Sequence, residues 1–337
     1  MPSGLPKQSQ RRAWQFGFFT LFLLAPSLNL FRFDLTETQL YLLGIKWHLG
    51  IDALMHGQAT PAQTAVQLLL KGLLPILLFI IGGLTVAWKY GRLYCGWLCP
   101  HFSIVETLNG ALRRASGKFS LWDKHPLPPT LPNGKPVQQS RWWWPVFGLG
   151  AVLFAGLWAV TLLTYLLPPA QIWHNLIHAT LTPNQARFLG AGTLVFSAEF
   201  LFARHLFCRF GCAVGLFQSL AWMANDKGMV VAFDRERARD CRTCHVPYGS
   251  ACDNACPMRL HPRDIKRMMF SCVQCGQCLE ACDQSQAVHD KPPLLTWKVD
   301  ADAVRETIRQ RKSAMAQASG EPPAVPRGCP PPPPRSA

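Results

Sequence analysis

Charged residues are scarce in this sequence. They make up 16% of the 337 residues, whereas hydrophobic residues make up 49%. A soluble globular chain is usually about 25% charged, so the shortage argues against a fully soluble protein and favours a membrane protein. The sequence also lacks a recognisable flavin- or nicotinamide-binding motif, so neither organic cofactor is predicted.

Acidic residues are scarcer than basic residues. There are 19 Asp and Glu against 34 Lys and Arg, which gives a net charge of +15. Such an excess can indicate nucleic-acid binding, but here the basic residues are spread over particular loops and are not gathered on one helix with interleaved aromatics. Basic cytoplasmic loops of a membrane protein explain the charge better, so no nucleic-acid partner is predicted.

A small-residue cleavage site is missing from the amino-terminal segment. The chain begins MPSGLPKQSQRR and then turns apolar, and no A-x-A pattern follows Leu24, so we expect an uncleaved signal anchor. A bilayer-spanning helix needs about 20 mostly apolar residues. Four stretches meet this requirement and predict four transmembrane helices, over residues 13–31, 67–88, 142–167 and 188–207.

Lys and Arg are distributed unevenly between the loops, and this sets the expected orientation. They are concentrated before the first predicted span, between the second and third, and after the fourth. Both termini and the cysteine-rich segment are therefore expected in the cytoplasm. In chain order we predict a transmembrane domain over 1–227, a small soluble α+β domain over 228–300, and a helix followed by a proline-rich disordered tail over 301–337.

The thirteen cysteines are clustered, which favours metal binding over disulfides. The stretch CVQCGQCLEAC has the C-x2-C-x2-C-x3-C spacing of bacterial ferredoxins, in which three cysteines hold one [4Fe–4S] cluster and the fourth holds another. Its members are Cys272, Cys275, Cys278 and Cys282. An upstream run has the same ends but a middle gap of x7. Its members are Cys241, Cys244, Cys252 and Cys256.

Exchange of the fourth ligands between the two runs predicts two cluster sites. Site 1 consists of Cys241, Cys244, Cys252 and Cys282. Site 2 consists of Cys272, Cys275, Cys278 and Cys256. Two zinc knuckles are the alternative, because zinc ligands also come in close pairs. The successive x2 spacings favour clusters over zinc, and the x7 gap leaves the assignment of Cys252 open.

Two further cysteine pairs lie at predicted membrane boundaries. Cys95 and Cys99 follow the second span, Cys208 and Cys212 follow the fourth, and we refer to these four as the C-x3-C thiols. In each pair the spacing places both thiols on one face of a helix. Four thiolates can then meet at one site that holds copper, zinc or iron, or forms a redox disulfide; soft thiolates suit Cu(I) well. The alternative is buried, unreactive cysteine. Cys329 has no predicted role.

Several ionisable residues near the spans are further candidates. His174 and His178 are spaced i, i+4 in an outer loop and either bind a metal, a haem or a quinone, or are ordinary surface histidines. Glu199, Arg204 and His205 fall within the fourth predicted span, where ionisable residues are functional candidates. Pairing of Glu199 with Arg204 is the simpler alternative.

The order of these motifs resembles a known family. The segments GRLYCGWLCP and CRFGCAVGLFQSLAWMANDKGMVVAFDRER, followed by a dicluster ferredoxin segment, are similar to the membrane-bound [4Fe–4S] polyferredoxins. The similarity is closest to the CcoG/FixG/RdxA-type cytochrome oxidase accessory proteins, and NapH- and NosR-type proteins are more distant. It covers roughly residues 13–290 and departs from the family at the x7 gap and at Ala213, where the family has proline.

The resemblance implies a multi-pass protein of the bacterial inner membrane, with two [4Fe–4S] clusters on sites 1 and 2. The expected fold is an α-helical membrane domain of about four transmembrane helices plus a small α+β dicluster ferredoxin-like domain. One implied role is reduction of Cu(II) for assembly of cytochrome oxidase, with oxidase assembly factors as partners. Another is electron delivery from the quinol pool to a periplasmic reductase. A non-redox scaffold with structural clusters is the third hypothesis.

Overall fold

The computed structural model describes residues 8–318 except 38, 52, 53, 55, 59, 124 and 245–249. The predicted proline-rich tail, with Cys329, lies outside these residues. By their contacts the residues form two units, each discontinuous in sequence. Unit 1 takes its described residues from Met1–Phe16, Val86–Gly148 and Phe202–Ala337, and unit 2 consists of Gly17–Thr85 and Leu149–Leu201. The domain boundaries predicted in chain order stay a prediction.

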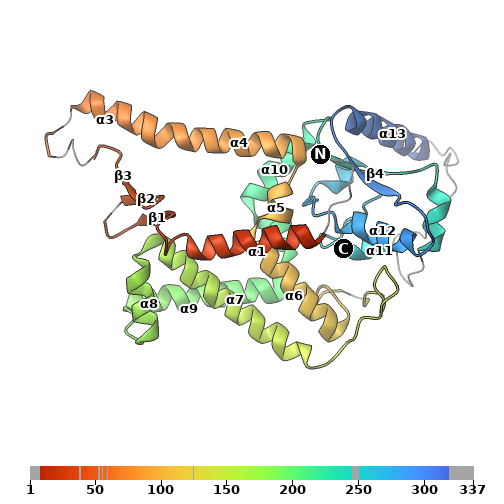
Figure 1. The fold of residues 1–337 in the computed structure, drawn as a ribbon, viewed down its shortest axis with the longest axis horizontal. Helices are drawn as coiled ribbons and strands as arrows, with labels where there is room; N and C mark the ends of the chain where they lie inside the picture. The colour runs from red at the N-terminus through yellow and green to blue at the C-terminus, as the bar shows by residue number, and fades with distance from the viewer. Residues whose placement is uncertain are drawn as a thin grey trace. The chain divides into compact units, whose positions relative to one another are not determined.

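Unit 2 contains a small antiparallel sheet. Its strands are β1 (Phe31–Asp34), β2 (Gln39–Leu42) and β3 (Ile45–Trp47), which follow one another as a meander (Figure 1). Leu43 and Gly44 connect β2 to β3, and their φ angles of 50° and 80° are those of the two-residue turn that suits the twist of a hairpin.

The helices of unit 2 carry most of its apolar surface, and some continue into unit 1. They are α3 (Pro61–Gln67), η1 (Leu68–Leu73), α4 (Leu74–Tyr90), α7 (Trp143–Leu166), α8 (Pro169–Ile177), α9 (Pro183–Ala198) and η2 (Glu199–Ala203). Helices α7, α8 and α9 lie side by side (Figure 1) and share a core that includes Leu163, Ile172 and Leu189. Helix α4 instead leaves its side chains exposed; Phe79, for example, is 82% exposed. Such a continuous apolar surface suits lipid.

Three helices among the described residues are long and apolar enough to cross a membrane. They are Pro61–Tyr90, Trp143–Leu166 and Pro183–Ala203, and they correspond to the second, third and fourth predicted spans. The first predicted span, 13–31, differs. Helix α1 (Gln8–Leu24) has 17 residues, about 26 Å of helix, and strand β1 begins at Phe31. Three of the four predicted spans thus have a long apolar helix among the described residues, and a crossing over 13–31 stays a prediction.

Unit 1 combines short helices near the membrane boundaries with the cysteine-rich segment. Its helices are α5 (Leu93–Trp97), α6 (Pro100–Ser116), η3 (Phe207–Gly211), α10 (Ala213–Met223), η4 (Ala238–Thr243), α11 (Ala251–Ala255), η5 (Lys266–Met269), α12 (Gln277–Ala287) and α13 (Ala301–Ala318). Its strands are β4 (Val230–Phe233) and β5 (Leu295–Lys298). They pair antiparallel.

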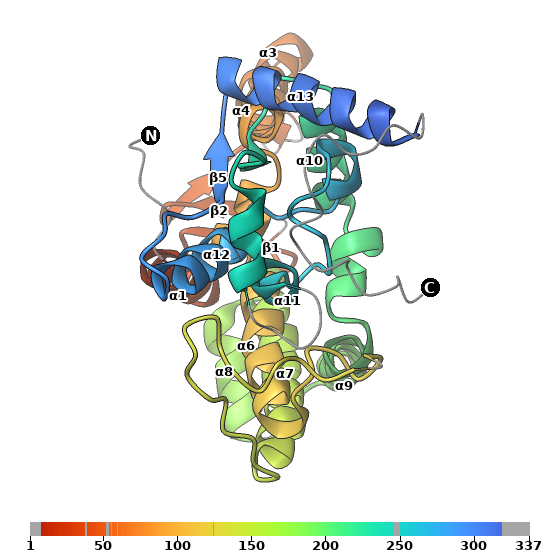
Figure 2. The ribbon, with the colours of Figure 1, turned by 90° about the vertical axis from the view of Figure 1, so that its right-hand side faces the viewer.

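The cysteine-rich part of unit 1 is α+β, as predicted. Helix α13 packs on strands β4 and β5, and α11 packs against α12 (Figure 2). A single core cluster joins Phe102 of α6 and Trp222 of α10 to Val230 of β4 and Met269 of η5. Because this core is shared, the helices that flank the C-x3-C pairs and the cysteine-rich segment fold as one body.

Candidate functional site

All twelve candidate ligands lie in unit 1. Eleven of them are free thiols. Cys241 is disulfide-bonded, so a role for it as a cluster ligand requires that this disulfide be reduced.

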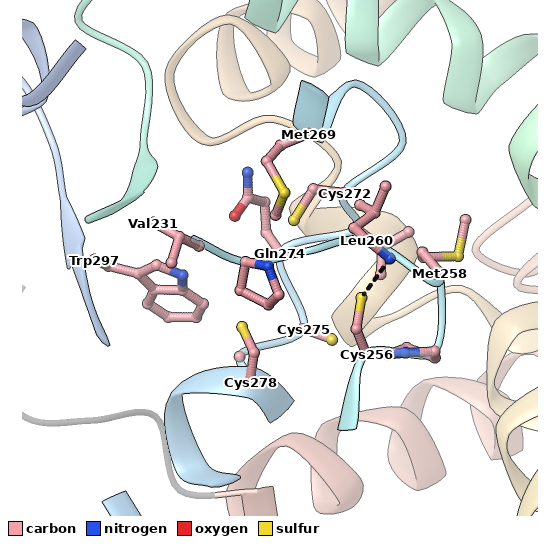
Figure 3. A pocket seen from close by; sticks show the side chains of 14 residues that line it. Val231, Cys256, Met258, Leu260, Met269, Cys272, Gln274, Cys275, Cys278 and Trp297 are labelled. Atoms are coloured by element: carbon pink, nitrogen blue, oxygen red, sulfur yellow. Dashed lines mark hydrogen bonds between the residues drawn. The ribbon is translucent and has the colours of Figure 1, made fainter. Parts of the chain in front are cut away.

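The four predicted ligands of site 2 line one pocket (Figure 3). Cys256 follows α11, Cys272 and Cys275 lie in the loop before α12, and Cys278 lies in the first turn of α12. The remaining lining is mostly apolar and includes Val231, Met258, Leu260, Met269 and Trp297. This arrangement fits a [4Fe–4S] cluster, because the charge of its thiolates is balanced by iron and does not need water.

Two left-handed residues bend the loop of site 2. Gln274 has a φ of 54° and Gly276 a φ of 74°, a conformation that glycine adopts without strain. Gly276 is also the N-cap of α12, on which Cys278 and Cys282 stand four residues apart and share a face. The sequence CGQC therefore supplies both the bend and the start of the helix.

Site 1 is assembled from η4, α11 and α12. Three of its predicted ligands share one hydrophobic cluster, namely Cys241, Cys252 and Cys282. The x7 gap thus does not keep Cys252 away from the others. Cys244 accepts hydrogen bonds from the backbone N–H of Ala251 at 3.2 Å and from the hydroxyl of Ser285 at 3.4 Å. Cys278 belongs to the same hydrophobic cluster as site 1, so the two sites adjoin.

Burial opposes ionisation of these thiols. It raises the pKa of Cys252 and of Cys272 to about 12. Burial also raises the pKa of Cys278 well above its ordinary value, and nearby thiols add to this effect. The thiolate is the form that binds metal, so iron must displace protons from this interior. Backbone N–H groups favour that exchange: Leu260 donates to the Cys256 sulfur at 3.4 Å and Leu294 to the Cys282 sulfur at 3.3 Å.

The two C-x3-C pairs have a similar local structure. The prediction that both thiols of a pair share one face of a helix was wrong, because the first helical turn ends before the second cysteine and a new helix begins there. Each first cysteine lies in a short helical turn, Cys95 in α5 and Cys208 in η3. Each second cysteine is an N-cap, Cys99 of α6 and Cys212 of α10. Two backbone N–H groups of the first turn of α6 donate to the Cys99 sulfur. A helix N-terminus stabilises a thiolate through its dipole and its free N–H groups.

The two pairs lie within range of each other's charge. Burial raises the pKa of Cys95 to about 12, and the neighbouring thiols of Cys99 and Cys212 raise it as well, because nearby thiolates repel. Burial raises the pKa of Cys99, to which Cys212 adds. Cys208 packs, with Cys95 and Cys99, against the core cluster that contains ligands of site 2.

The first C-x3-C segment rests directly on the loop of site 2. A Cβ on Gly96 would lie 2.2 Å from the carbonyl oxygen of Val273 and 3.2 Å from the Cα of Cys275, so glycine is required for this approach. Trp97 Nε1 donates to the carbonyl oxygen of Gln274 at 3.0 Å. Sequence reasoning did not find this contact, because cysteine spacing carries no information about distant backbone.

A buried network at the amino terminus was also missed. Arg11 is 1% exposed; it donates to the Glu106 carboxylate and, at 2.9 Å, to the carbonyl oxygen of Gly96. Gln8 donates to the carbonyl oxygen of Cys275 at 2.9 Å. Loop charges indicated only an orientation for Arg11, although its side chain joins α1 to the first C-x3-C segment and Gln8 joins α1 to the loop of site 2.

A ligand group of the size that holds one metal ion is not found among the described residues, either at sites 1 and 2 or among the remaining candidates. Such a group would need three His, Cys, Asp or Glu side chains close together. In unit 2 the rings of His174 and His178 stack with centroids 4.2 Å apart. In unit 1 Arg204 donates to Asn109 at 2.9 Å, and the pairing of Glu199 with Arg204 stays a prediction.

Comparison with known proteins places an iron–sulfur domain on the C-x3-C segments. The chain matches the family described as a 4Fe-4S binding domain over residues 73–118 and 184–227, and each match contains one C-x3-C pair. The resemblance seen in the motifs is thus confirmed for iron–sulfur binding.

Two curated relatives are similar to the chain. It is 24% identical over 242 residues to ferredoxin-type protein NapH of Escherichia coli (strain K12), across 67% of this chain and 72% of the relative. It is 25% identical over 211 residues to protein RdxA of Cereibacter sphaeroides, across 58% of this chain and 41% of the relative. No solved structure matches. The chain is a distant homologue of these ferredoxin-type membrane proteins.

Proposed function

We propose that this iron–sulfur, ferredoxin-type membrane electron-transfer protein reduces Cu(II) to Cu(I) at its C-x3-C thiols, in support of cytochrome oxidase assembly. The observation that carries the proposal is the contact between the first C-x3-C segment and the loop of site 2. Gly96 lies against Val273, and Trp97 is hydrogen-bonded to Gln274. An electron-carrying site and a group of soft thiols therefore share one packed surface.

Site 2 offers four free thiols to a [4Fe–4S] cluster, and site 1 offers a second set of four once the disulfide of Cys241 is reduced. Such clusters supply reversible one-electron transfer when bound. Buried thiols and backbone N–H donors are what the chain itself contributes. Copper is the substrate in this proposal: Cu(II) gains one electron and becomes Cu(I), which soft thiolates bind well. The activity is thus that of a cupric reductase, and the electron comes from a redox partner protein.

The contacts of unit 1 support the predicted orientation. Gln8 and Arg11 hydrogen-bond to Cys275 and Gly96, so these residues lie on one side of the membrane. Helix Pro61–Tyr90 is long and apolar enough for one crossing between them, and this proposal then requires a second crossing before it. Helix α1 leads into the interval that contains this crossing. We accordingly place the first crossing in the predicted span 13–31, with the clusters and both termini in the cytoplasm of a bacterial inner membrane.

The test uses protein purified without oxygen, reduced with dithionite and freed of the reductant. Buffered Cu(II) is added, and Cu(I) formation is recorded with the loss of the EPR signal of the reduced clusters. We expect wild type to form one Cu(I) for each electron lost. A Cys95→Ser/Cys99→Ser variant is expected to react at least ten times more slowly. A His174→Gln/His178→Gln variant serves as the control, because that pair could also bind copper, and it should react like wild type.

Equal rates for wild type and the cysteine variant would defeat the proposal, since copper would then take electrons from the clusters directly. Clusters that neither reduce nor reoxidise would favour the scaffold hypothesis instead.

Quinol-coupled electron delivery is the second candidate. The alignment covers 72% of NapH but only 41% of RdxA, and NapH-type proteins were the ones whose resemblance implied a quinol. Reduction of the clusters by a soluble quinol, in the absence of dithionite, would favour this candidate over copper reduction.

A further inference from the structure

We propose that His101 is a copper ligand and that it forms, with Cys208, the pair that receives Cu(II) and retains it as Cu(I). The inference rests on the proposed copper reduction and deepens it, because it assigns a nitrogen ligand that decides which metal ion the C-x3-C thiols accept. Two observations carry it: the contact of this imidazole with a thiol of the other segment, and the cation that lies beside that thiol.

His101 contacts both C-x3-C pairs. It lies in the first turn of α6, and its side chain is buried. Its backbone N–H donates to the sulfur of Cys99, and its Nδ1 lies 3.5 Å from the Sγ of Cys208 in η3. The corresponding position of the second segment, two residues after Cys212, is Val214. The first segment therefore contributes an imidazole that has no counterpart in the second.

The distance between Cys208 and His101 suits two ligands of one metal ion. Bonds of about 2.3 Å to sulfur and about 2.0 Å to nitrogen, the lengths that zinc forms, separate the two atoms by roughly 3.5 Å at a tetrahedral angle. A thiol and an imidazole this close share a proton, and a metal ion that binds them releases it. The described residues offer no group of three ligands, but Cu(I) is stable with two.

A buried cation lies beside the proposed pair. Arg92 is 1% exposed, and its Nη1 donates to the carbonyl oxygen of Cys208 at 3.0 Å. Its electrostatic neighbours include the thiols of Cys208 and of Cys272, a predicted ligand of site 2. A cation near a thiol favours the thiolate, which is the form that binds copper. On the imidazole side the ring of Phe207 packs against His101, with centroids 5.2 Å apart.

One nitrogen and one sulfur ligand suit both states of the substrate. Imidazole binds Cu(II) well, whereas a soft thiolate prefers Cu(I). A pair of one each therefore holds copper before and after reduction without an exchange of ligands. Copper is also the divalent first-row ion that such ligands bind most tightly, so the imidazole favours Cu(II) over Zn(II).

The reaction at this pair is a one-electron exchange. Cu(II) forms bonds to Nδ1 of His101 and Sγ of Cys208, and the thiol proton passes to water. The bound Cu(II) then gains one electron from a reduced cluster and becomes Cu(I). Cys208 packs with Cys95 and Cys99 against the core cluster that contains ligands of site 2. These two thiols can take Cu(I) from the pair and free it for the next ion, so turnover depends on them as well.

The first test identifies the atoms bound to copper. Full-length protein with oxidised clusters receives one equivalent of Cu(I) from a buffered chelate without oxygen, and X-ray absorption is measured at the copper edge. We expect imidazole and sulfur neighbours in wild type. His101→Gln should lose the imidazole signal and bind Cu(I) roughly tenfold more weakly or worse. His205→Gln is the matched control, because it replaces a nearby histidine whose ring contacts Asn109, and it should behave like wild type.

The second test separates a ligand from a structural histidine. In His101→Gln the Cu(II) concentration that gives half the maximal rate should rise about tenfold, while the iron content and the EPR signal of the reduced clusters stay those of wild type. His101→Cys provides a second thiol. It should hold Cu(I) at least as tightly as wild type and yet reduce Cu(II) more slowly, because the nitrogen ligand for Cu(II) is gone. A structural role would not divide the two properties in this way.

The assignment is overturned if copper in wild type has no imidazole neighbour, or if zinc displaces copper when both are offered. These outcomes differ from failure of the proposed function. Copper reduction without an imidazole on copper would reject the pair alone. Imidazole-bound Cu(I) in a protein whose reduced clusters leave Cu(II) unreduced would reject copper reduction alone.

Discussion

Two buried arginines of unit 1 differ in what balances their charge. Arg11 and Arg92 are both 1% exposed. Arg11 forms a two-pronged ion pair with Glu106. Arg92 donates to two neutral oxygen atoms and lies 6.0 Å from the centroid of the Phe270 ring, and its Nη2 has no hydrogen-bond partner among the described residues. The paired arginine fastens α1 to the C-x3-C segment. Arg92 has the thiols of Cys95, Cys208 and Cys212 among its electrostatic neighbours.

A third buried cation lies between these extremes. Lys266 is 7% exposed, and its Nζ donates to the carbonyl oxygens of Trp222 and Asn225. Partial negative charges surround it, but no carboxylate accepts its hydrogen bonds among the contacts of the described residues. The three cations therefore differ in what accepts their hydrogen bonds: a carboxylate for Arg11, two carbonyl oxygens for Lys266, and a hydroxyl and one carbonyl oxygen for Arg92.

Removal of the counter-charge of Arg11 is expected to have the largest effect. Glu106→Ala leaves a buried guanidinium without its partner, so the free energy of unfolding should fall by about 3 kcal/mol. Denaturant unfolding in detergent, followed by tryptophan fluorescence, measures the change. The double variant Arg11→Met/Glu106→Met removes both charges and should recover most of the lost free energy of unfolding. A Glu106→Ala protein as stable as wild type would show that Arg11 is not held by this pair.

The contact that joins the two thiol groups is the next target. In Gly96→Ala the new Cβ would lie 2.2 Å from the carbonyl oxygen of Val273, so backbone must shift. We expect a loss of about 1–3 kcal/mol in the free energy of unfolding and slower oxidation of the reduced clusters by Cu(II). Gly110→Ala is the matched control, because nothing lies within 4 Å of a Cβ there. Equal stability of the two variants would rule out a close contact at Gly96.

The smallest expected effect concerns Lys266 and pH. Burial lowers the pKa of Lys266 to about 8, from an ordinary value of 10.5. Between pH 8 and pH 10.5 the amine of Lys266 is protonated in the unfolded chain but not in the folded chain. The free energy of unfolding should therefore rise with pH from about 8 to 10.5. The contribution of Lys266 to the free energy of unfolding can rise by no more than ~1.4 kcal/mol per pH unit. The difference between wild type and Lys266→Met, measured across this window, isolates the effect; a flat difference would contradict the lowered pKa.

Cysteine spacing was sufficient to predict the grouping of site 2, because most of its ligands are close in sequence. Cys272, Cys275 and Cys278 are separated by two residues each, and the bend at Gly276 keeps them around one pocket. The addition of Cys256 followed from the ferredoxin pattern. The neighbours of the C-x3-C thiols were beyond such reasoning, since Arg92 and Gly96 owe their roles to contacts with residues far along the chain.

The apolar pattern located three of the long helices and misjudged the start of α1. Composition favoured a span over 13–31, yet the helix begins at Gln8. The side chains of Gln8, Arg11 and Gln15 are buried because they find hydrogen-bond partners in unit 1. A hydrophobicity argument treats such residues as solvent-exposed, and it therefore places the helix boundary too late.

The similar local structure of the two C-x3-C segments has a consequence for symmetry. One C-x3-C segment supplies only two thiols. A four-thiol site made from one such segment would need a second copy of it, as in a two-fold dimer. When both segments belong to one chain, their sequences can differ. Three residues before the first cysteine stands Arg92 in one copy and His205 in the other, and after the second cysteine stand Pro100 and Ala213. A site built from both pairs would be symmetric in its ligands and asymmetric in the charged residues beside them.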